Sequence, residues 1–170
     1  MRMKTIAEVI NETLPFATRS VLAQSRIHLT EARVDRPVYD LIALIGFSGD
    51  EGLVGTVGFA TEQSILKAEY DESETYLSEG WLGEIVNQLL GRLKNALLPY
   101  GLEINLQLPK VLHGIRLQIG SESNQVKHYM YTSEFGRCCT WVDANWDLNR
   151  NLQLAVLEEQ VQSEGDMILF

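Results

Sequence analysis

Three positions spaced about one helical turn apart, Glu84, Asn87 and Gly91, are the residues whose types and spacing could do chemistry. In an α-helix this spacing places all three along one line of the surface. Glycine in an exposed helix interior is about 1 kcal/mol less favourable than alanine, and no helix crossing on that face requires one. The simplest functional explanation is that another molecule approaches the backbone at Gly91, beside a carboxylate and a carboxamide.

The stretch that positions these residues runs from Ser78 to Gly101 and predicts one amphipathic helix. Ser78 is a suitable N-cap, Pro99 cannot continue a helix, and Gly101 suits a left-handed stop. The apolar arc comprises Leu82, Ile85, Val86, Leu89, Leu90, Leu93, Ala96 and Leu97. The opposite arc comprises Glu84, Asn87, Gln88, Gly91, Arg92, Lys94 and Asn95. On periodicity alone, the simpler interpretation of this second arc is a solvated helix face.

A resemblance favours the functional interpretation. The segment EIVNQLLGRLK, from Glu84 to Lys94, resembles the E-x-x-N-x-x-x-G-x-x-K helix of the CheX family of chemotaxis phosphatases. The segment GLEINLQLPKVLHG, from Gly101 to Gly114, is similar to the strand and LP-x-V-x-x-G turn that follow in that family. The resemblance extends over roughly Val38 to Asp143, and its two adjoining motifs have matching order and spacing.

The resemblance implies a phosphatase that acts on the aspartyl phosphate of a CheY-type response regulator. Asn87 would orient the attacking water, and Glu84 would pair with the lysine of the regulator's active site. Gly91 would let the regulator approach the helix, and further partner contacts would come from Gln88, Arg92 and Lys94. The Mg²⁺ would belong to the regulator, so that this chain needs no cofactor or metal ligands of its own. The resemblance also implies a homodimer.

Two other interpretations stay open beside the enzyme. An adaptor could keep the face that docks the receiver domain and regulate without hydrolysis, although it would not need the water-orienting amide of Asn87. Alternatively, the resemblance could cover the fold alone, since fold does not establish function.

Composition narrows the class of protein. The chain has 170 residues, of which 45% are apolar and 22% charged, which predicts one ordinary globular domain. A formal net charge of −9 argues against nucleic acid and anionic membranes as partners. No secretory signal or membrane-spanning apolar run is evident. The adjacent Cys138 and Cys139 fit a reducing cytoplasm and opposite faces of one strand, with a vicinal redox pair as the alternative.

The N-terminal segment from Met1 to Gln24 has helical spacing, and Pro15 predicts either a kink or two shorter helices. Glu8 and Asn11 repeat the E-x-x-N spacing. The related CheC family has two such helices, whereas CheX proteins use one. The first copy here lacks the downstream Gly and Lys, which favours a chance repeat, but a second site stays open.

The remaining pattern predicts an α+β fold, a mostly antiparallel sheet packed on the long helix and the N-terminal helix. The strands expected are 38–47, 53–60, 102–108, 115–119, 125–132 and 137–143, the last four as an antiparallel run. Alternation in 102–108 predicts that its leucines all face the core. A short helix capped by Thr61 is expected through about Glu69. Residues 1–150 would form the CheX-like domain, and 151–170 a C-terminal extension in which Asn151 to Gln162 could be a helix.

Overall fold

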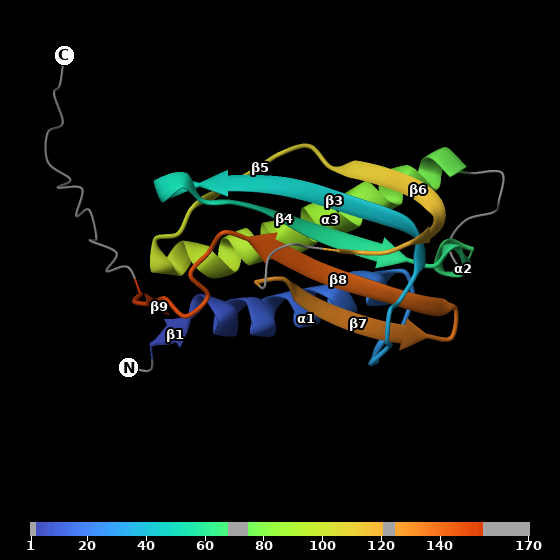
Figure 1. Ribbon diagram of the computed structural model, residues 1–170, viewed down its shortest axis with the longest axis horizontal. Coiled ribbons are helices and arrows are strands. Elements are labelled where there is room, and N and C mark those ends of the chain that lie inside the picture. Colours follow the sequence, from blue (N-terminus) through green and yellow to red (C-terminus); the bar gives the residue numbers. More distant parts are fainter. Residues whose placement is uncertain (1–2, 68–74, 121–124, 155–170) are drawn as a thin grey trace, which may run out of the picture.

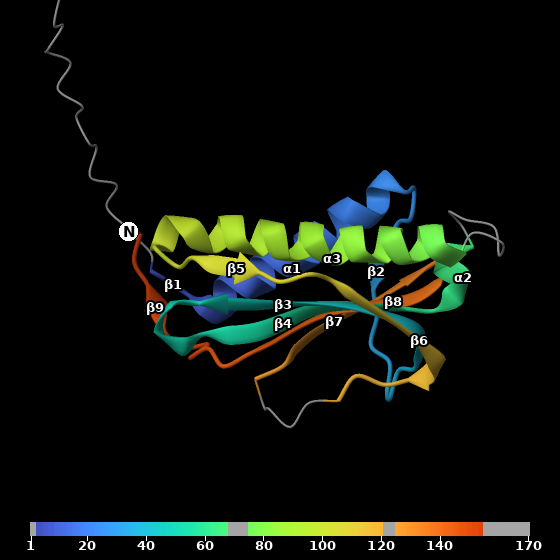
Figure 2. The ribbon, with the colours of Figure 1, turned by 90° about the horizontal axis from the view of Figure 1, so that it is seen from above.

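Two helices lie side by side on one face of an antiparallel sheet (Figures 1 and 2). The structure, a computed structural model, describes residues 3–67, 75–120 and 125–154. The helices are α1 (Ile6–Gln24) and α3 (Thr75–Leu97). A short α2 (Gln63–Leu66) lies between them in the chain. The α+β prediction, with both long helices against the sheet, is confirmed.

The strand order of the main sheet is β2-β7-β8-β4-β3-β5. On the outer edge of β3, β5 pairs with the end of the strand and β6 pairs with its first part. Every pairing is antiparallel. The strands are β2 (Thr30–Glu31), β3 (Tyr39–Gly49), β4 (Val54–Thr61), β5 (Ile104–Leu106), β6 (Lys110–Leu117), β7 (Lys127–Ser133) and β8 (Gly136–Ala144). The four strands after α3 therefore do not form one run, because β5 and β6 lie at one edge of the sheet and β7 and β8 toward the other.

The main core lies between the helices and the sheet. Leu82 and Leu89 of α3 belong to the same buried cluster as Phe47 and Phe59 of the central strands, and all four are at most 1% exposed. A smaller apolar cluster covers the other face of the sheet around Tyr39, Ile42, Ala60, Cys139 and Trp141. Cys138 belongs to the first cluster and Cys139 to the second, which confirms the prediction that they occupy opposite faces of one strand.

Helix α1 continues through Pro15, so the prediction of two shorter helices is wrong. A proline in a helix interior costs about 3 kcal/mol, but its neighbours Leu14 and Ala17 are fully buried against the core. Burial of this apolar face offsets the lost hydrogen bond. The helix begins with a capping box, in which Thr5 Oγ1 accepts from the N–H of Glu8 and the Glu8 carboxylate accepts from the N–H of Thr5.

Helix α3 begins at Thr75, so the prediction of Ser78 as its N-cap is wrong. Ser78 is only 5% exposed and lies inside the helix, where packing has extended the helix beyond the local capping signal. The other end agrees with the prediction. A 3₁₀ turn (Leu98–Tyr100) follows the helix, and Gly101 has a φ of 70°, in the left-handed region.

Three shorter predictions also need correction. The strand expected over 102–108 is limited to β5, and Leu108 is 85% exposed rather than facing the core. Thr61 ends β4, and Glu62 occupies the N-cap position of α2. The physical reason for the first difference is Pro109, which has no N–H to continue the ladder with β3.

Residues 151 and 152 take part in a second, two-stranded sheet. β9 (Asn151–Leu152) pairs antiparallel with β1 (Lys4–Thr5), so the start of the predicted helix over Asn151 to Gln162 is a strand. The rest of that prediction, from residue 155 onward, lies outside the described residues. Among the described residues, no helix combines the length and apolarity that a bilayer crossing requires.

Candidate functional site

The residues singled out from the sequence lie together on the outer face of α3. The Glu84 side chain is exposed. Partly exposed beside it are Asn87, Gln88, Gly91, Arg92 and Lys94. The opposite face of the same helix, including Ile85, Val86 and Leu93, is at most 2% exposed and belongs to the core. The predicted division of this helix into two faces is confirmed, and we call its exposed line of residues from Glu84 to Lys94 the α3 ridge.

The carboxylate of Glu84 is held by its own helix. Gln88 Nε2 donates a hydrogen bond to Glu84 Oε1 over 3.0 Å, from one turn further along the ridge. This contact leaves the second carboxylate oxygen, Oε2, to accept from another donor. Glu84 is therefore oriented while retaining an oxygen for a cation on another molecule.

The amide of Asn87 has no hydrogen-bond partner among the described residues. A carboxamide offers two N–H donors and one carbonyl acceptor, so a full set of bonds is available to a ligand. Gly91 stands one turn later, and a Cβ placed on it would meet nothing within 4 Å. No packing within the described chain therefore requires a glycine there, which fits a position kept small for an approaching molecule.

Two cationic side chains extend the α3 ridge toward its C-terminus. Arg92 and Lys94 appear in none of the ion pairs among the described residues. Lys94 lies in the last turn of α3, where a positive charge suits the helix dipole. Together with Glu84, they give the ridge charges of both signs.

Neighbouring elements fix α3 from both sides. On the side of α1, Trp81 Nε1 donates to Ser25 Oγ over 3.3 Å. On the side of β6, Glu79 Oε1 lies 2.9 Å from His113 Nε2. Pro109 packs close to Gly83, with its Cγ 3.5 Å from the position of an added Cβ. Pro109 and His113 were not predicted from the sequence to position this helix, although both lie in the segment that is similar to the LP-x-V-x-x-G turn.

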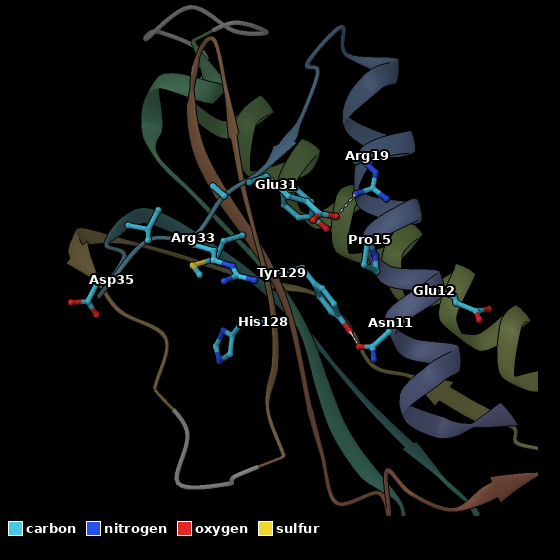
Figure 3. Close-up of a pocket in the computed structure, with 13 residues that line it drawn as sticks. Asn11, Glu12, Pro15, Arg19, Glu31, Arg33, Asp35, His128 and Tyr129 are labelled. Carbon is cyan, nitrogen blue, oxygen red and sulfur yellow. Dashed lines mark hydrogen bonds and ion pairs between the residues drawn. The ribbon is translucent and has the colours of Figure 1, made fainter.

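The second E-x-x-N pair lies on α1 and is engaged within the protein. Glu8 closes the capping box with Thr5. Asn11 Oδ1 accepts a 2.6 Å hydrogen bond from Tyr129 Oη of β7 (Figure 3). This pair therefore ties α1 to its own N-terminus and to the sheet.

A groove of about 1210 Å³ lies between α1, the segment after β2 and β7 (Figure 3). The ion pair of Arg19 Nη1 with Glu31 Oε1, at 3.2 Å, crosses one part of it. None of the α3 residues whose side chains the structure describes lines this groove. The ridge is thus separate from it, and a projecting helix face suits insertion into the cleft of a partner better than capture of a small molecule.

The cysteines do not form a reactive site. Both are at most 1% exposed, and burial raises the pKa of both thiols, that of Cys139 to about 11. At neutral pH both are therefore protonated and poorly nucleophilic. The described residues also contain no cluster of three or more His, Cys, Asp or Glu side chains that could hold a metal ion.

Several solved structures that are similar to this one are of chemotaxis proteins. A CheC-like superfamily protein from Shewanella sp. PV-4 aligns with a TM-score of 0.69 at 20% identity, over 81% of this chain and 98% of that one. The chemotaxis protein CheX from Vibrio vulnificus aligns with a TM-score of 0.70 at 17% identity, over 79% and 98%. This chain has the CheC/CheX fold.

A third structure with this fold contains a partner. It is a complex of CheX with CheY, BeF₃ and Mg²⁺ from Borrelia burgdorferi, and its aligned chain has a TM-score of 0.61 at 14% identity, over 79% of this chain and 96% of that one. No family model and no curated protein matches the sequence. The sequence motifs predicted a CheX-like fold, and the similarity to solved structures confirms it.

Proposed function

We propose that this protein is a phosphatase for the aspartyl phosphate of a CheY-type receiver domain. The observation that carries the proposal is the pairing, on one exposed ridge, of an oriented Glu84 carboxylate with an Asn87 amide that no described residue engages. The CheC/CheX fold and the existence of a CheX–CheY complex in Borrelia burgdorferi support a receiver as the partner.

Asn87 is the residue we assign to the reaction itself. Its carboxamide accepts a hydrogen bond from the attacking water and can donate another to a phosphoryl oxygen. The water oxygen attacks phosphorus, the bond from phosphorus to the aspartate oxygen breaks, and the products are inorganic phosphate and the free aspartate of the receiver. Because the amide is neutral, it positions water without repelling the phosphoryl oxygens, and such transfers depend mainly on positioning and charge stabilisation.

Glu84 is the residue we assign to docking. Its carboxylate pairs with the lysine of the receiver's active site, one turn of helix away from the water held by Asn87. Gln88 keeps this carboxylate oriented through the 3.0 Å hydrogen bond, so that less side-chain entropy is lost on binding. Glu84 thereby sets the register in which Asn87 enters the receiver.

The other residues of the ridge make the rim of the contact. Gly91 allows the loops of the receiver to approach the helix backbone, and Arg92 and Lys94 face an acidic partner surface. The Mg²⁺ that the reaction needs is supplied by the receiver, whose acidic pocket holds it next to the phosphoryl group. We further propose that the protein works as a homodimer, as the family resemblance implies, and in the reducing cytoplasm, which Cys138 and Cys139 favour.

The proposal is tested with a panel of receiver domains from the host, each examined for binding and for phosphoryl loss. A beryllofluoride-activated receiver mimics the phosphorylated state, and binding to it should exceed binding to the unactivated form. The protein should also accelerate phosphate release from the same receiver in the presence of Mg²⁺. Binding without acceleration would identify an adaptor, and absence of binding to every receiver would leave only the fold.

A further inference from the structure

The outer edge formed by β5 and β6 carries exposed apolar side chains beside the α3 ridge. Leu108 is 85% exposed and Leu106 is 38% exposed, and further along the same edge Ile115 is 91% exposed. A single exposed leucine needs no explanation. Leu106 and Leu108, however, lie together on a fixed segment next to the proposed docking residues, and this position requires an explanation.

The segment that presents Leu108 is anchored on both sides of it. The N–H of Gln107 donates to the carbonyl of Gly46 over 2.9 Å. The Gln107 side chain also lies over Gly46, in the space that a Cβ on this glycine would occupy. On the other side of Leu108, Pro109 restricts the backbone and packs near Gly83 of α3. Leu108 is therefore held outward by its neighbours.

The register of this segment along α3 places Leu108 next to the proposed site. His113 contacts Glu79, and Pro109 lies near Gly83, so the strand segment runs antiparallel to the helix. Continued in the same direction, Leu108 and Leu106 flank the turns of α3 that begin at Glu84. Figures 1 and 2 both show β5 running alongside this helix.

We propose that Leu108, with Leu106 beside it, is the apolar part of the docking surface for the receiver domain, an inference that rests on the proposed function. The α3 ridge supplies charged groups of both signs and neutral polar groups, but no large exposed apolar side chain. An apolar contact at its flank excludes water from the Glu84 contact, as the ring of contacts around an interface hot spot does for the groups that it surrounds. The partner surface that fits is a receiver whose acidic pocket is bordered by an apolar side chain.

The test compares Leu108→Ser with Ile115→Ser, because Ile115 is equally exposed on the same edge but lies beyond His113, away from Glu84. Titrations use the beryllofluoride-activated receiver that binds wild type most tightly. Removing one buried leucine contact should raise the Kd of Leu108→Ser about tenfold. Ile115→Ser should bind like wild type, and Leu108→Met should retain most of the affinity because it keeps an apolar side chain of similar volume.

Sedimentation of the same three variants separates the receiver from a second copy of this chain as the occupant. The proposal is supported if all three variants sediment with the same mass as wild type and only Leu108→Ser binds the receiver more weakly. Equal receiver affinity for Leu108→Ser and wild type overturns it, and so does a loss of self-association in both serine variants, which would assign the edge to contacts between copies. If wild type binds no receiver, the proposed function itself fails, whereas failure of this inference alone leaves wild-type binding intact.

Discussion

The spacing Glu-x-x-Asn occurs on two neighbouring helices, and the protein uses the two pairs differently. On α3, the Asn87 amide has no partner among the described residues and Glu84 bonds Gln88 of its own ridge. On α1, Glu8 caps the helix and Asn11 accepts from Tyr129. Such a motif therefore indicates a site only where its side chains are free to face a partner, and the hydrogen bond from Tyr129 directs the Asn11 amide toward the sheet instead.

Substitution of Asn87 should have the largest effect on activity. Asn87→Ala should lower the rate of receiver dephosphorylation about a hundredfold or more, in line with the removal of one positioned hydrogen-bonding group from an active site. Its melting temperature should stay within about 2 °C of wild type, because the side chain is partly exposed and bonds nothing described. Asn95→Ala is the matched control, since Asn95 is an exposed asparagine on the same helix. A large drop in the melting temperature of Asn87→Ala would contradict its placement on the ridge.

Substitution of Glu84 should have the next largest effect. Glu84→Ala should raise the Kd for the activated receiver and lower the rate at limiting receiver concentrations, each about tenfold, because a charge-assisted hydrogen bond to the partner is lost. Glu84→Gln keeps the size of the side chain but not its charge, and should behave similarly if charge pairing is the cause. Titration calorimetry with each variant measures this effect, and a rate equal to wild type would remove Glu84 from the site.

The pair on α1 should affect stability and not activity. Replacing both Glu8 and Asn11 by alanine removes the capping box and the 2.6 Å bond from Tyr129. The expected loss in the free energy of unfolding is about 2 kcal/mol, or roughly 4–8 °C in melting temperature. The rate of receiver dephosphorylation per folded molecule, measured below the melting temperature, should equal that of wild type. A rate near half of wild type would instead reveal a second site on α1.

The smallest effect is expected at Gly91, with opposite signs for stability and binding. Gly91→Ala should stabilise the protein by up to about 1 kcal/mol, because alanine is the better helix former and the added Cβ meets nothing within 4 Å. The same methyl should weaken receiver binding by occupying the space of the contact. Thermal melts and titrations of this variant distinguish the two effects, and a more stable variant with unchanged affinity would show that no partner approaches there.

Local pattern was sufficient to predict the faces of α3, because apolar periodicity and burial have the same physical origin. The start of that helix was not predictable in this way, since Ser78 has the chemistry of a cap but is buried within the helix. The strand after α3 was predicted too long, because alternation does not reveal that the ladder with β3 breaks before Pro109.

The contrast between the two Glu-x-x-Asn pairs required the tertiary structure. Asn11 and Tyr129 are 118 residues apart in the chain, and nothing in the local sequence indicates their contact. Likewise, the sequence placed Leu108 among core-facing leucines, whereas its exposed position beside α3 depends on anchors at Gly46 and Gly83. Availability of a side chain is a property of the fold, so spacing alone could suggest both pairs but not choose between them.

The role of Asn87 is tested by measuring phosphate release from phosphorylated receiver domains, with Mg²⁺, in the presence of wild type, Asn87→Ala or Asn11→Ala. Wild type and Asn11→Ala should accelerate release from the same receiver to the same extent, while Asn87→Ala should leave the rate at the receiver's own value. Acceleration by Asn87→Ala equal to that of wild type would show that the α3 amide does not orient the attacking water.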